Sequence, residues 1–462
     1  MKFLFSIFFL TPFWCASLTQ IMGKTVGSEG EWIHIYEIDE FATRNETALQ
    51  KFKITSDNQF YFEINNKVIK KYVIRLSNVY TELFLQPNSA YNIVIPQETI
   101  DVIPYFSGKE TELLFLDLDS IDINYKILGF EAWMDDEMAS LYLLKDADPS
   151  KFIDGVLKFK MAILKEYKND SSIYFKNHIK YVLGKTIDNI NYFGGPNASE
   201  KFSFYIKNQD VLYDLPSYMD YFRDYYNGIR QKLSPSSKRV INLALFEADG
   251  RMLIKGLLID SIVPSQKIAE IVALQIIEEE YPKGNISQNN LIGITRYLQR
   301  NSKHEKNTLI AKNLARKFYT IVSGDPLPTI QINEDTYLGT PSQYQYLHFF
   351  DPSNPQSLAQ SKAMKLLHEK YGETISFVSI YLNGESGAFQ ERIINSMKWP
   401  CYGLDYYHPI WKSLNVNTFP YYILVNENLI IESIPALGPI PNGTYETIAK
   451  RFFDIQKTKK GN

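Results

Sequence analysis

The spacing of the apolar residues is the feature that most restricts what this chain can fold into, because it changes twice. Between residues 32 and 125, apolar and polar residues alternate as in half-buried strands. From 148 to 323, the apolar residues recur at helical spacing. After 325, strand-like and helix-like segments follow one another. These changes of period predict a multidomain protein, which a chain of 462 residues is long enough to form.

The alternating residues predict an antiparallel β-sandwich over residues 22–127. Short runs in which every second residue is apolar are separated by turn-forming segments such as "SDNQ" (56–59). Several such strands at regular spacing are typical of two packed sheets. The segment 113–127 changes its apolar phase, which predicts a bulge or turn at Asp119–Ser120.

Three aspartates in that segment, Asp117, Asp119 and Asp122, raise the question of a metal site. Carboxylate oxygens are ligands for hard cations such as Ca²⁺. The alternation along a strand also explains them, because it places charged side chains on a solvent-facing side. We expect the solvated strand face, and we predict no metal ligands in this chain.

Residues 145–322 are predicted to be all-helical. In 149–168 the apolar side chains recur every three or four residues, and 171–193 continues the pattern. Loops such as "FGGPNAS" (193–199) separate the periodic segments. Further helices are expected over 217–232, 236–261, 265–280, 287–299 and 306–322.

Residues 325–457 are predicted to form a mixed-sheet α/β domain. The helix after its first strand should begin near Pro355 and end with Gly372 as a C′ residue. Strands are expected over 345–350, 374–382, 420–426 and 429–434, and helices over 355–372, 386–398, 408–415 and 442–457.

The first residues, "MKFLFSIFFLTPFWCASLTQ", fit a secretory signal peptide. The small side chains of Cys15 and Ser17 suit cleavage after Ser17, which assigns 1–17 to the signal. A retained anchor is the weaker alternative, because the apolar run is shorter than the ~20 residues of a membrane span. A lipoprotein anchored through Cys15 is another alternative, although residues 12–14 do not fit its processing pattern. We expect export to the periplasm or cell envelope, with no integral membrane span in the mature chain.

Cysteine content and charge exclude several kinds of protein. The chain has two cysteines, and removal of the signal peptide leaves only Cys401. The mature chain then has neither an intramolecular disulfide nor a zinc site built on paired cysteines. The net charge of −3 is too small to predict binding to nucleic acid.

The order of strands and helices in 325–457 is that of the thioredoxin fold, and three segments resemble the extracytoplasmic TlpA-like thiol-disulfide proteins of Gram-negative envelopes. The segment "LPTIQINEDTYLGTPSQYQYLHFFDPSNPQ" is similar to that family's lead-in, hairpin and first strand, and "ISFVSIYLNGE" to its second strand. The segment "WKSLNVNTFPYYILVNENLII" resembles the stretch that holds the family's cis-proline. The alternating region resembles, more weakly, the small β-domain that often precedes such modules in Bacteroidota-type proteins.

The resemblance implies a Cys-x-x-Cys motif where this chain has Ser353 and Gln356. In the active family a thiolate at a helix N-terminus attacks a disulfide, and the second cysteine resolves the mixed disulfide. A serine hydroxyl forms no disulfide, so dithiol exchange at these degenerate positions is excluded. No Gly-x-Ser-x-Gly elbow surrounds Ser353, and the spacing of His348 and His368 implies no contact with it. We predict no catalytic residue here and interpret Ser353 as the N-cap of a helix over 355–371.

The same resemblance implies a peptide-binding loop around a cis-proline, which would be Pro420. In the family the exposed backbone before this proline pairs with an extended peptide, and the corresponding residues here are Thr418, Phe419 and Pro420. Neighbouring aromatic residues could line a groove for a peptide or a hydrophobic ligand, or they could pack in the core. They are Phe350, Trp399, Tyr402, Tyr406, Tyr407, Trp411 and Tyr421.

Three functions are compatible with the sequence. We favour an exported thioredoxin-like binding or scaffold protein of the bacterial envelope, without a dithiol site or cofactor, that holds an extended peptide or an envelope protein. The alternative is a thiol-disulfide oxidoreductase or peroxidase-like enzyme acting through Cys401 alone, although we expect this cysteine in a loop rather than at a helix N-terminus. The third is a surface-assembly protein whose β-domain and helical region bind the partners.

Overall fold

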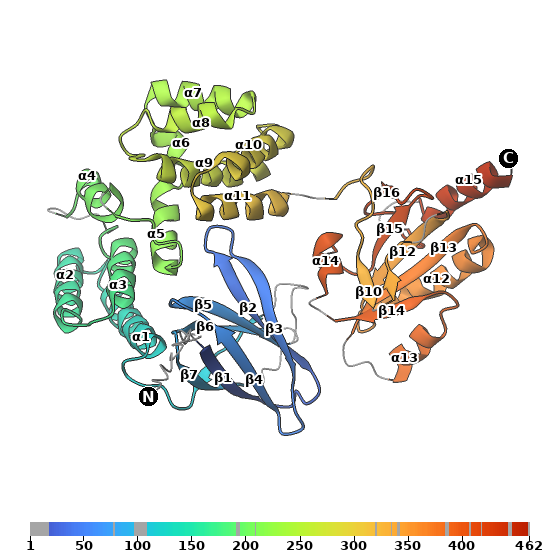
Figure 1. The fold of residues 1–462 in the computed structure, drawn as a ribbon, viewed down its shortest axis with the longest axis horizontal. Helices are drawn as coiled ribbons and strands as arrows, with labels where there is room; N and C mark the ends of the chain where they lie inside the picture. Colours follow the sequence, from blue (N-terminus) through green and yellow to red (C-terminus); the bar gives the residue numbers. More distant parts are fainter. Residues whose placement is uncertain are drawn as a thin grey trace, which may run out of the picture. The chain divides into compact units, whose positions relative to one another are not determined.

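The described residues of the computed structural model form two compact units, which Figure 1 shows as ribbons. The first unit ends at Phe318, and the second follows it. The predicted signal peptide, with Cys15 and Ser17, lies outside the described residues, as do Tyr406 and Tyr407. The structure describes residues 18–76, 79–96, 109–190, 195–207, 209–318, 321–333, 335–339, 342–383, 388–405, 408–416, 418–441 and 446–460.

Two packed sheets form the β-domain of the first unit. One sheet has the strand order β4-β1-β7-β9, with β1 (Leu18–Thr25), β4 (Gln59–Asn65), β7 (Ala90–Ile95) and β9 (Leu114–Phe115). The other has the order β3-β2-β5-β6-β8, with β2 (Trp32–Glu40), β3 (Asn45–Lys53), β5 (Lys70–Leu76), β6 (Val79–Leu85) and β8 (Lys109–Glu110). Ile21 and Phe62 of the first sheet and Ile33 and Ile74 of the second belong to one buried cluster, so the sheets form a sandwich.

This sandwich is mixed, which corrects the predicted antiparallel arrangement. β1 pairs parallel with β7, and β6 pairs parallel with β8. Alternation of apolar residues determines which face of a strand is buried, but it contains no information about strand direction. Only strands joined by a short hairpin have to be antiparallel, and β1 and β7 are separated by the whole β2–β6 segment.

The β-domain begins and ends earlier than predicted. β1 starts at Leu18 rather than at 22, and α1 (Ile123–Tyr142) begins inside the segment predicted as strand up to 127. Ile123 and Ile127 are both buried, and their spacing of four residues fits a strand as well as a helix. The following buried residues of α1, at helical spacing, are Phe130, Met134, Met138 and Leu141.

The three aspartates of that segment do not share a strand face. A turn is present as predicted, because the Asp122 N–H donates to the Asp119 carbonyl at 2.9 Å. Asp122 is buried and caps α1 by accepting from the Asn124 N–H at 2.7 Å, whereas Asp117 and Asp119 are exposed. Among the described residues, no three acidic, histidine or cysteine side chains are grouped closely enough to hold a metal ion.

The rest of the first unit is a helical region, as predicted. It contains α2 (Pro149–Glu166), α3 (Ile173–Thr186), α4 (Ala198–Phe202), the π-helix η1 (Ser203–Lys207), α5 (Pro216–Tyr226), α6 (Ile229–Lys232), α7 (Pro235–Phe246), α8 (Gly250–Leu257), α9 (Gln266–Glu280), the 3₁₀ turn η2 (Tyr281–Lys283), α10 (Gln288–Asn301) and α11 (Glu305–Phe318). The helix predicted over 236–261 is divided into α7 and α8, because Ala248 is left-handed (φ 59°) and Asp249 caps α8. No helix in the described ranges has both the length and the hydropathy that a membrane crossing requires.

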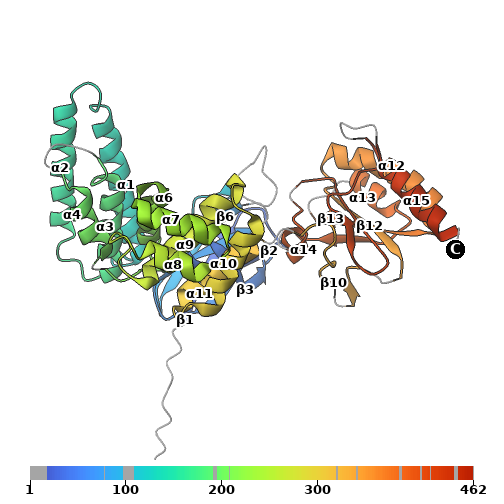
Figure 2. The same ribbon diagram turned by 90° about the horizontal axis from the view of Figure 1, so that it is seen from above.

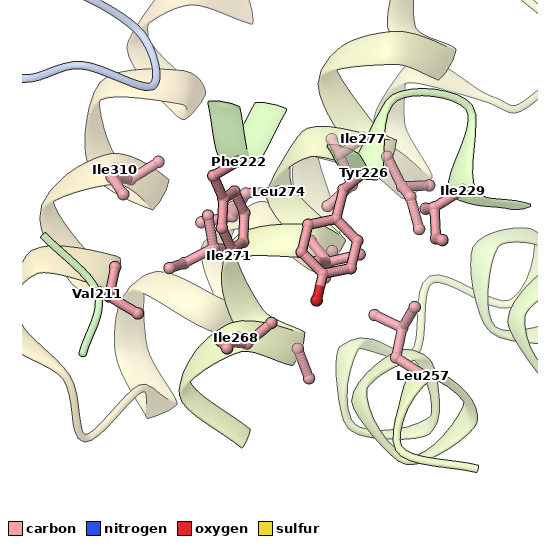
Figure 3. Close-up of a cluster of buried hydrophobic side chains, with 14 of the residues drawn as sticks. Val211, Phe222, Tyr226, Ile229, Leu257, Ile268, Ile271, Leu274, Ile277 and Ile310 are labelled. Carbon is pink, nitrogen blue, oxygen red and sulfur yellow. The ribbon is translucent and has the colours of Figure 1, made fainter. Parts of the chain in front are cut away.

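The core of the helical region forms where α5 crosses α9. Phe222 and Tyr226 of α5 belong to one buried cluster with Ile271 and Leu274 of α9 and Ile310 of α11, and Figure 3 shows Phe222 beside Ile271 and Leu274. Phe222 and Tyr226 are fully buried. Their spacing of four residues places both rings on the same face of α5, whereas Tyr218 and Tyr221 of this helix pack against Tyr181 of α3.

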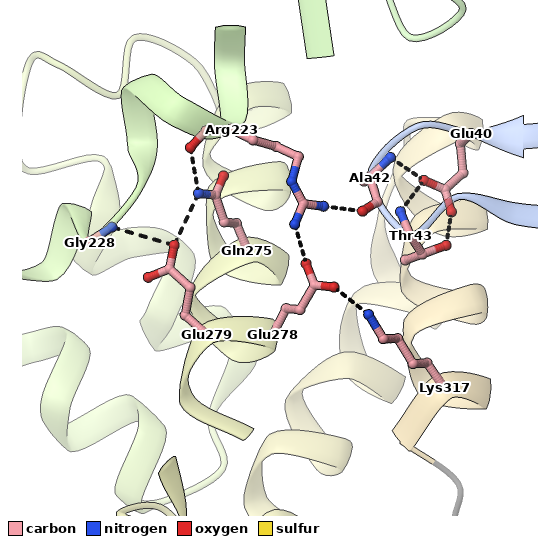
Figure 4. Close-up of polar contacts among 9 residues, drawn as sticks. All are labelled: Glu40, Ala42, Thr43, Arg223, Gly228, Gln275, Glu278, Glu279 and Lys317. Atoms are coloured by element: carbon pink, nitrogen blue, oxygen red, sulfur yellow. Dashed lines mark hydrogen bonds and ion pairs between the residues drawn. The ribbon is translucent and has the colours of Figure 1, made fainter. Parts of the chain in front are cut away.

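The β2–β3 hairpin joins the β-domain to these helices. Arg223 of α5 donates to the Ala42 carbonyl and forms an ion pair with Glu278 of α9 at 3.0 Å (Figure 4). Lys317 of α11 binds the other oxygen of Glu278 at 2.8 Å. The β-domain and the helical region therefore belong to the same compact unit.

A buried carboxyl group stabilises the tip of this hairpin. Glu40 is 1% exposed and accepts hydrogen bonds from the backbone N–H groups of Ala42 (2.7 Å) and Thr43 (2.9 Å) (Figure 4). It also accepts from the Thr43 hydroxyl and from the Asn313 amide of α11 at 3.1 Å. Each of these donors compensates part of the cost of removing the carboxyl group from water.

The second unit is a five-stranded mixed sheet with helices on both faces. The strand order is β14-β13-β12-β15-β16, with β12 (Tyr344–Phe350), β13 (Ile375–Leu382), β14 (Cys401–Leu404), β15 (Tyr421–Val425) and β16 (Ile431–Ser433). β13 is parallel to β12 and β14, whereas β15 is antiparallel to β12 and β16. A small hairpin of β10 (Gln331–Asn333) and β11 (Thr336–Tyr337) precedes the sheet.

The helices of this unit bury the two faces of the sheet. α12 (Pro355–Tyr371) and α15 (Ile448–Lys460) lie side by side (Figure 2), and Met364 and Phe452 pack there against Tyr346. α14 (Pro409–Ser413) covers the other face, where Trp411 packs against Phe349. The remaining helix is α13 (Ala388–Asn395). This arrangement is the predicted thioredoxin-like fold.

α12 ends differently from the prediction. Its C-cap is Gly372, which has an ordinary helical φ of −61° instead of the left-handed conformation of a C′ glycine. A Cβ at this position would lie 2.6 Å from the His368 carbonyl oxygen. Glycine is required here by that close approach and not by a positive φ.

Candidate functional site

The N-terminus of α12 is the place where the thioredoxin-like fold would carry a redox pair. Asn354 caps this helix by accepting from the backbone N–H groups of Gln356 (2.9 Å) and Ser357 (3.2 Å). The predicted cap, Ser353, is therefore wrong by one residue. Pro355 at the first helical position explains this, because the residue before a proline is restricted to the extended conformation that a cap requires.

The two degenerate positions lie at the surface and carry no reactive group. Ser353 and Gln356 are exposed. The backbone N–H and the hydroxyl of Ser353 both donate to Asp351 Oδ1 at 2.7 Å. The hydroxyl therefore donates to a carboxyl group of its own turn, and no hydrogen bond joins Ser353 to a histidine of the described residues.

A buried polar group lies on the sheet face that α12 covers. His348 of β12 is fully buried and stacks between Phe350 (4.8 Å between ring centroids) and Tyr422 (5.1 Å). Its Nδ1 is 3.1 Å from Ser379 Oγ, which accepts a hydrogen bond from Trp399 Nε1 at 2.8 Å. Burial lowers the pKa of His348 to about 3, so the ring is neutral at physiological pH.

This buried group was not identified as a site from the sequence, although a signal was present. Alternation in β12 places residues 346, 348 and 350 on one face, so a histidine among aromatic residues there has to be buried. Its Nε2 and the hydroxyl of Ser357 on α12 make no hydrogen bond to a described residue. Neither group is hydrogen-bonded to Ser353, whose hydrogen bonds go to Asp351.

Cys401 lies in a strand, which corrects the prediction of a loop. It opens β14, which pairs parallel with β13, and it is half-buried. Its Sγ lies 3.7 Å from Met397 Sδ. Burial raises the pKa of the thiol to about 12, so the thiol stays protonated near neutral pH. This environment does not favour the thiolate that disulfide exchange and peroxidase chemistry require.

The proposed peptide-binding loop has an exposed backbone beside a buried anchor. The Phe419–Pro420 peptide bond is cis. Phe419 is buried, and its ring meets Trp411 edge-to-face at 5.7 Å. Thr418 is exposed and makes no hydrogen bond to another described residue. The backbone of Thr418 is thus available to pair with an extended chain.

Three of the described aromatic residues that the sequence suggested for this groove are core residues. Phe350, Trp399 and Trp411 are buried, so they contribute to packing rather than to a surface groove. Tyr402 and Tyr421 are half-buried. Of the aromatic residues considered from the sequence, only these two remain as contacts for a ligand within the described ranges.

Comparisons with known proteins give distant structural similarity alone. No protein-family model and no curated protein matches the chain. A domain of a possible thiol-disulfide isomerase from Cytophaga hutchinsonii shares 13% identity, covers 31% of this chain and 99% of its own, and has a TM-score of 0.24. The thioredoxin domain of a thiol-disulfide oxidoreductase from Bacteroides vulgatus shares 11% identity, covers 30% of this chain and 99% of its own, and has a TM-score of 0.24. An uncharacterized thioredoxin-like protein from the same organism shares 21% identity, covers 26% of this chain and 74% of its own, and has a TM-score of 0.21. Similarity at this level assigns no activity to the chain.

Proposed function

We propose that this protein is an exported thioredoxin-like binding or scaffold protein of the bacterial envelope that does not perform dithiol chemistry. The observation that carries the proposal is the N-terminus of α12, where an alcohol and an amide, Ser353 and Gln356, occupy the positions of a redox pair. The environment of Cys401 supports the same conclusion, since a half-buried, protonated thiol in a strand is a poor nucleophile.

The binding element in this proposal is the loop before Pro420. An extended peptide would pair with the free backbone groups of Thr418, and its side chains would contact Tyr421. Backbone pairing requires an extended ligand but little sequence specificity. The ligand class is therefore an unfolded or extended segment of an envelope protein.

A disulfide-reduction assay tests the absence of redox activity. The wild-type protein and Cys401→Ala should reduce insulin no faster than dithiothreitol alone. The double variant Ser353→Cys/Gln356→Cys should form a disulfide and gain activity, because it places two thiols three residues apart at a helix N-terminus. The single variant Ser353→Cys is the matched control and should remain inactive. Wild-type turnover that disappears in Cys401→Ala would show that the protein is an enzyme.

A crosslinking experiment tests the binding loop. A photo-crosslinking amino acid replaces Thr418 in one variant and the exposed Lys362 of α12 in the control. The probe is a reduced and carboxymethylated protein, which is unfolded and free of thiols. We expect crosslinks at 418 that an excess of unlabelled probe suppresses, and none at 362. Equal crosslinking at both positions would show that the loop has no special role in binding.

A shortened chain separates this proposal from surface assembly by the first unit. If a chain ending at Ser323 binds the unfolded probe as tightly as the full chain does, the first unit is the binding element. If binding is lost, the second unit carries it.

A further inference from the structure

The first unit contains a groove that the proposed function does not use. It lies between α2, α3 and η1 and has a volume of about 400 Å³. Pockets that hold small ligands typically have volumes of about 300–1,000 Å³. The groove is therefore large enough for a ligand and not only for solvent.

The floor and walls of the groove are apolar. Ile163 of α2 and Ile179 and Leu183 of α3 form the floor and belong to the core below it. Leu164 and Phe204 form walls and are 46% and 57% exposed. Two large apolar side chains exposed at the same concave surface are unfavourable in water, and a hydrocarbon chain lying on them would remove that area from solvent.

Four lysines line the same groove, and they are Lys160, Lys168, Lys176 and Lys180. The nearest carboxyl groups already have partners. Asp188 binds Lys160 at 2.5 Å through one oxygen and accepts from the Tyr205 hydroxyl at 2.6 Å through the other.

The second carboxyl group near the lysines is Asp170. It forms an ion pair with Lys126 at 2.7 Å, and Lys176 also interacts with it electrostatically. No ion pair joins Lys168 or Lys180 to a carboxylate of the described residues. The lining of this apolar groove therefore has an excess of positive charge, because it contains four lysines and no acidic residue.

Lys180 lines the groove beside the exposed wall residue Phe204. Its ammonium group lies over the Phe204 ring, 4.5 Å from the centroid, and the side chain is half-buried. Burial lowers the pKa of this ammonium group, so an adjacent anion would stabilise its charged form. Lys176 is four residues earlier on α3, so the two ammonium groups project from the same side of this helix.

We propose that this groove binds a fatty acid, with its carboxylate between Lys176 and Lys180 and its alkyl chain on Ile163, Leu164 and Phe204. A fatty acid is the occupant that uses both the apolar floor and the lysines of the groove. An inorganic anion would not use the apolar floor, and a neutral lipid would not use the lysines. This site lies within the first unit, so it is independent of the peptide-binding function proposed for the second.

The test is calorimetric titration of the full chain with decanoate below its micellar concentration. Burial of a methylene group is worth about 0.8 kcal/mol, which corresponds to a factor of about four in affinity. Decanoate, with two more methylene groups, should therefore bind about fifteenfold more tightly than octanoate. It should also bind more tightly than decanol, which lacks the charge. Equal affinity for decanol and decanoate, or no dependence on chain length, would overturn the proposal.

Three variants identify the groove as the site. Lys180→Met keeps the apolar stem on Phe204 but removes the charge, so the affinity for decanoate should fall about tenfold and that for decanol should not change. Leu164→Asn should lower the affinity for both decanoate and decanol, because it removes apolar surface from the wall of the groove. Lys165→Met is the matched control, because Lys165 is an exposed lysine of α2 that does not line the groove. An equal loss in Lys165→Met and Lys180→Met would place the binding site elsewhere.

Discussion

The two units bury polar groups in different ways. In the first unit, Glu40 is buried where the hairpin meets the helices, and it accepts hydrogen bonds from several donors. In the second unit, His348 is buried between stacked rings and has Ser379 as its hydrogen-bonding neighbour. The first arrangement joins two structural regions through polar contacts, whereas the second keeps a titratable ring neutral by aromatic packing.

The largest expected effects test whether the two units are energetically separate. Phe222→Ala should destabilise the first unit by about 3–5 kcal/mol, because it leaves a cavity at the α5–α9 contact (Figure 3). Phe349→Ala should destabilise the second unit by a similar amount of about 3–5 kcal/mol. Hydrogen-exchange mass spectrometry measures both losses of stability, since peptides from α9 report on the first unit and peptides from β12 on the second.

Each of these two variants is the control for the other. Phe222→Ala should leave protection in β12 unchanged, and Phe349→Ala should leave protection in α9 unchanged. A loss of protection in both peptides with either variant would show that the chain unfolds as one cooperative unit, and the comparison of two units would then fail.

The next prediction concerns the polar contact between the sheet and the helices. Glu40→Ala leaves buried donors on Ala42, Thr43 and Asn313 without an acceptor, which should cost about 3 kcal/mol. The loss of protection should appear in α11 as well as in the β2–β3 hairpin, because Glu40 contacts both. Glu29→Ala, at an exposed position, is the control and should change the exchange protection of neither α11 nor the β2–β3 hairpin. Loss confined to the hairpin would mean that Glu40 does not connect the two regions.

The location of this contact could not be predicted from the sequence. Glu40 and Asn313 are separated by 273 residues, and neither lies in a pattern that points to the other. The succession of a β-rich, a helical and an α/β region was predictable, because burial imposes a different apolar period on each kind of element. Strand direction in the β-domain was not, because the parallel pairing of β1 with β7 depends on the connection and not on side chains.

At the candidate site, the sequence showed which chemistry the side chains lack, but it did not show which residue caps α12 or that Cys401 lies in a strand. Residue type alone excludes dithiol exchange at positions 353 and 356, since neither Ser353 nor Gln356 contains sulfur. The sequence analysis predicted Ser353 as the N-cap, whereas the structure has Asn354. Serine and asparagine are both preferred N-cap residues, so residue preference alone does not decide between two adjacent positions. β14, which contains Cys401, was missed because four residues are too few to show a period.

The third prediction uses pH to compare the buried groups. The pKa of His348 is lowered to about 3 in the folded state, whereas an unfolded histidine titrates near 6.5. The unfolded state therefore binds more protons between these values, so the second unit loses stability as the pH falls below about 6.5. Between pH 6.5 and 5 the loss should be about 2 kcal/mol, at about 1.4 kcal/mol per pH unit.

The variant His348→Phe tests this cause directly. Phenylalanine retains the stacking between Phe350 and Tyr422 but binds no proton, so exchange protection in β12 should become less dependent on pH. His304→Gln, in the first unit, is the control and should leave the pH profile of β12 unchanged. If His348→Phe retains the full acid sensitivity, other groups cause it.

The smallest expected effect distinguishes the two candidate caps of α12. Asn354→Ala should destabilise the N-terminus of the helix by about 1 kcal/mol, since it removes the acceptor of two backbone N–H groups. Ser353→Ala should cost at most about 0.5 kcal/mol, because the exposed hydroxyl exchanges its bond to Asp351 for bonds to water. Exchange rates in the first turn of α12 measure the difference. An equal or larger effect of Ser353→Ala would show that this serine, and not Asn354 alone, stabilises the junction between β12 and α12.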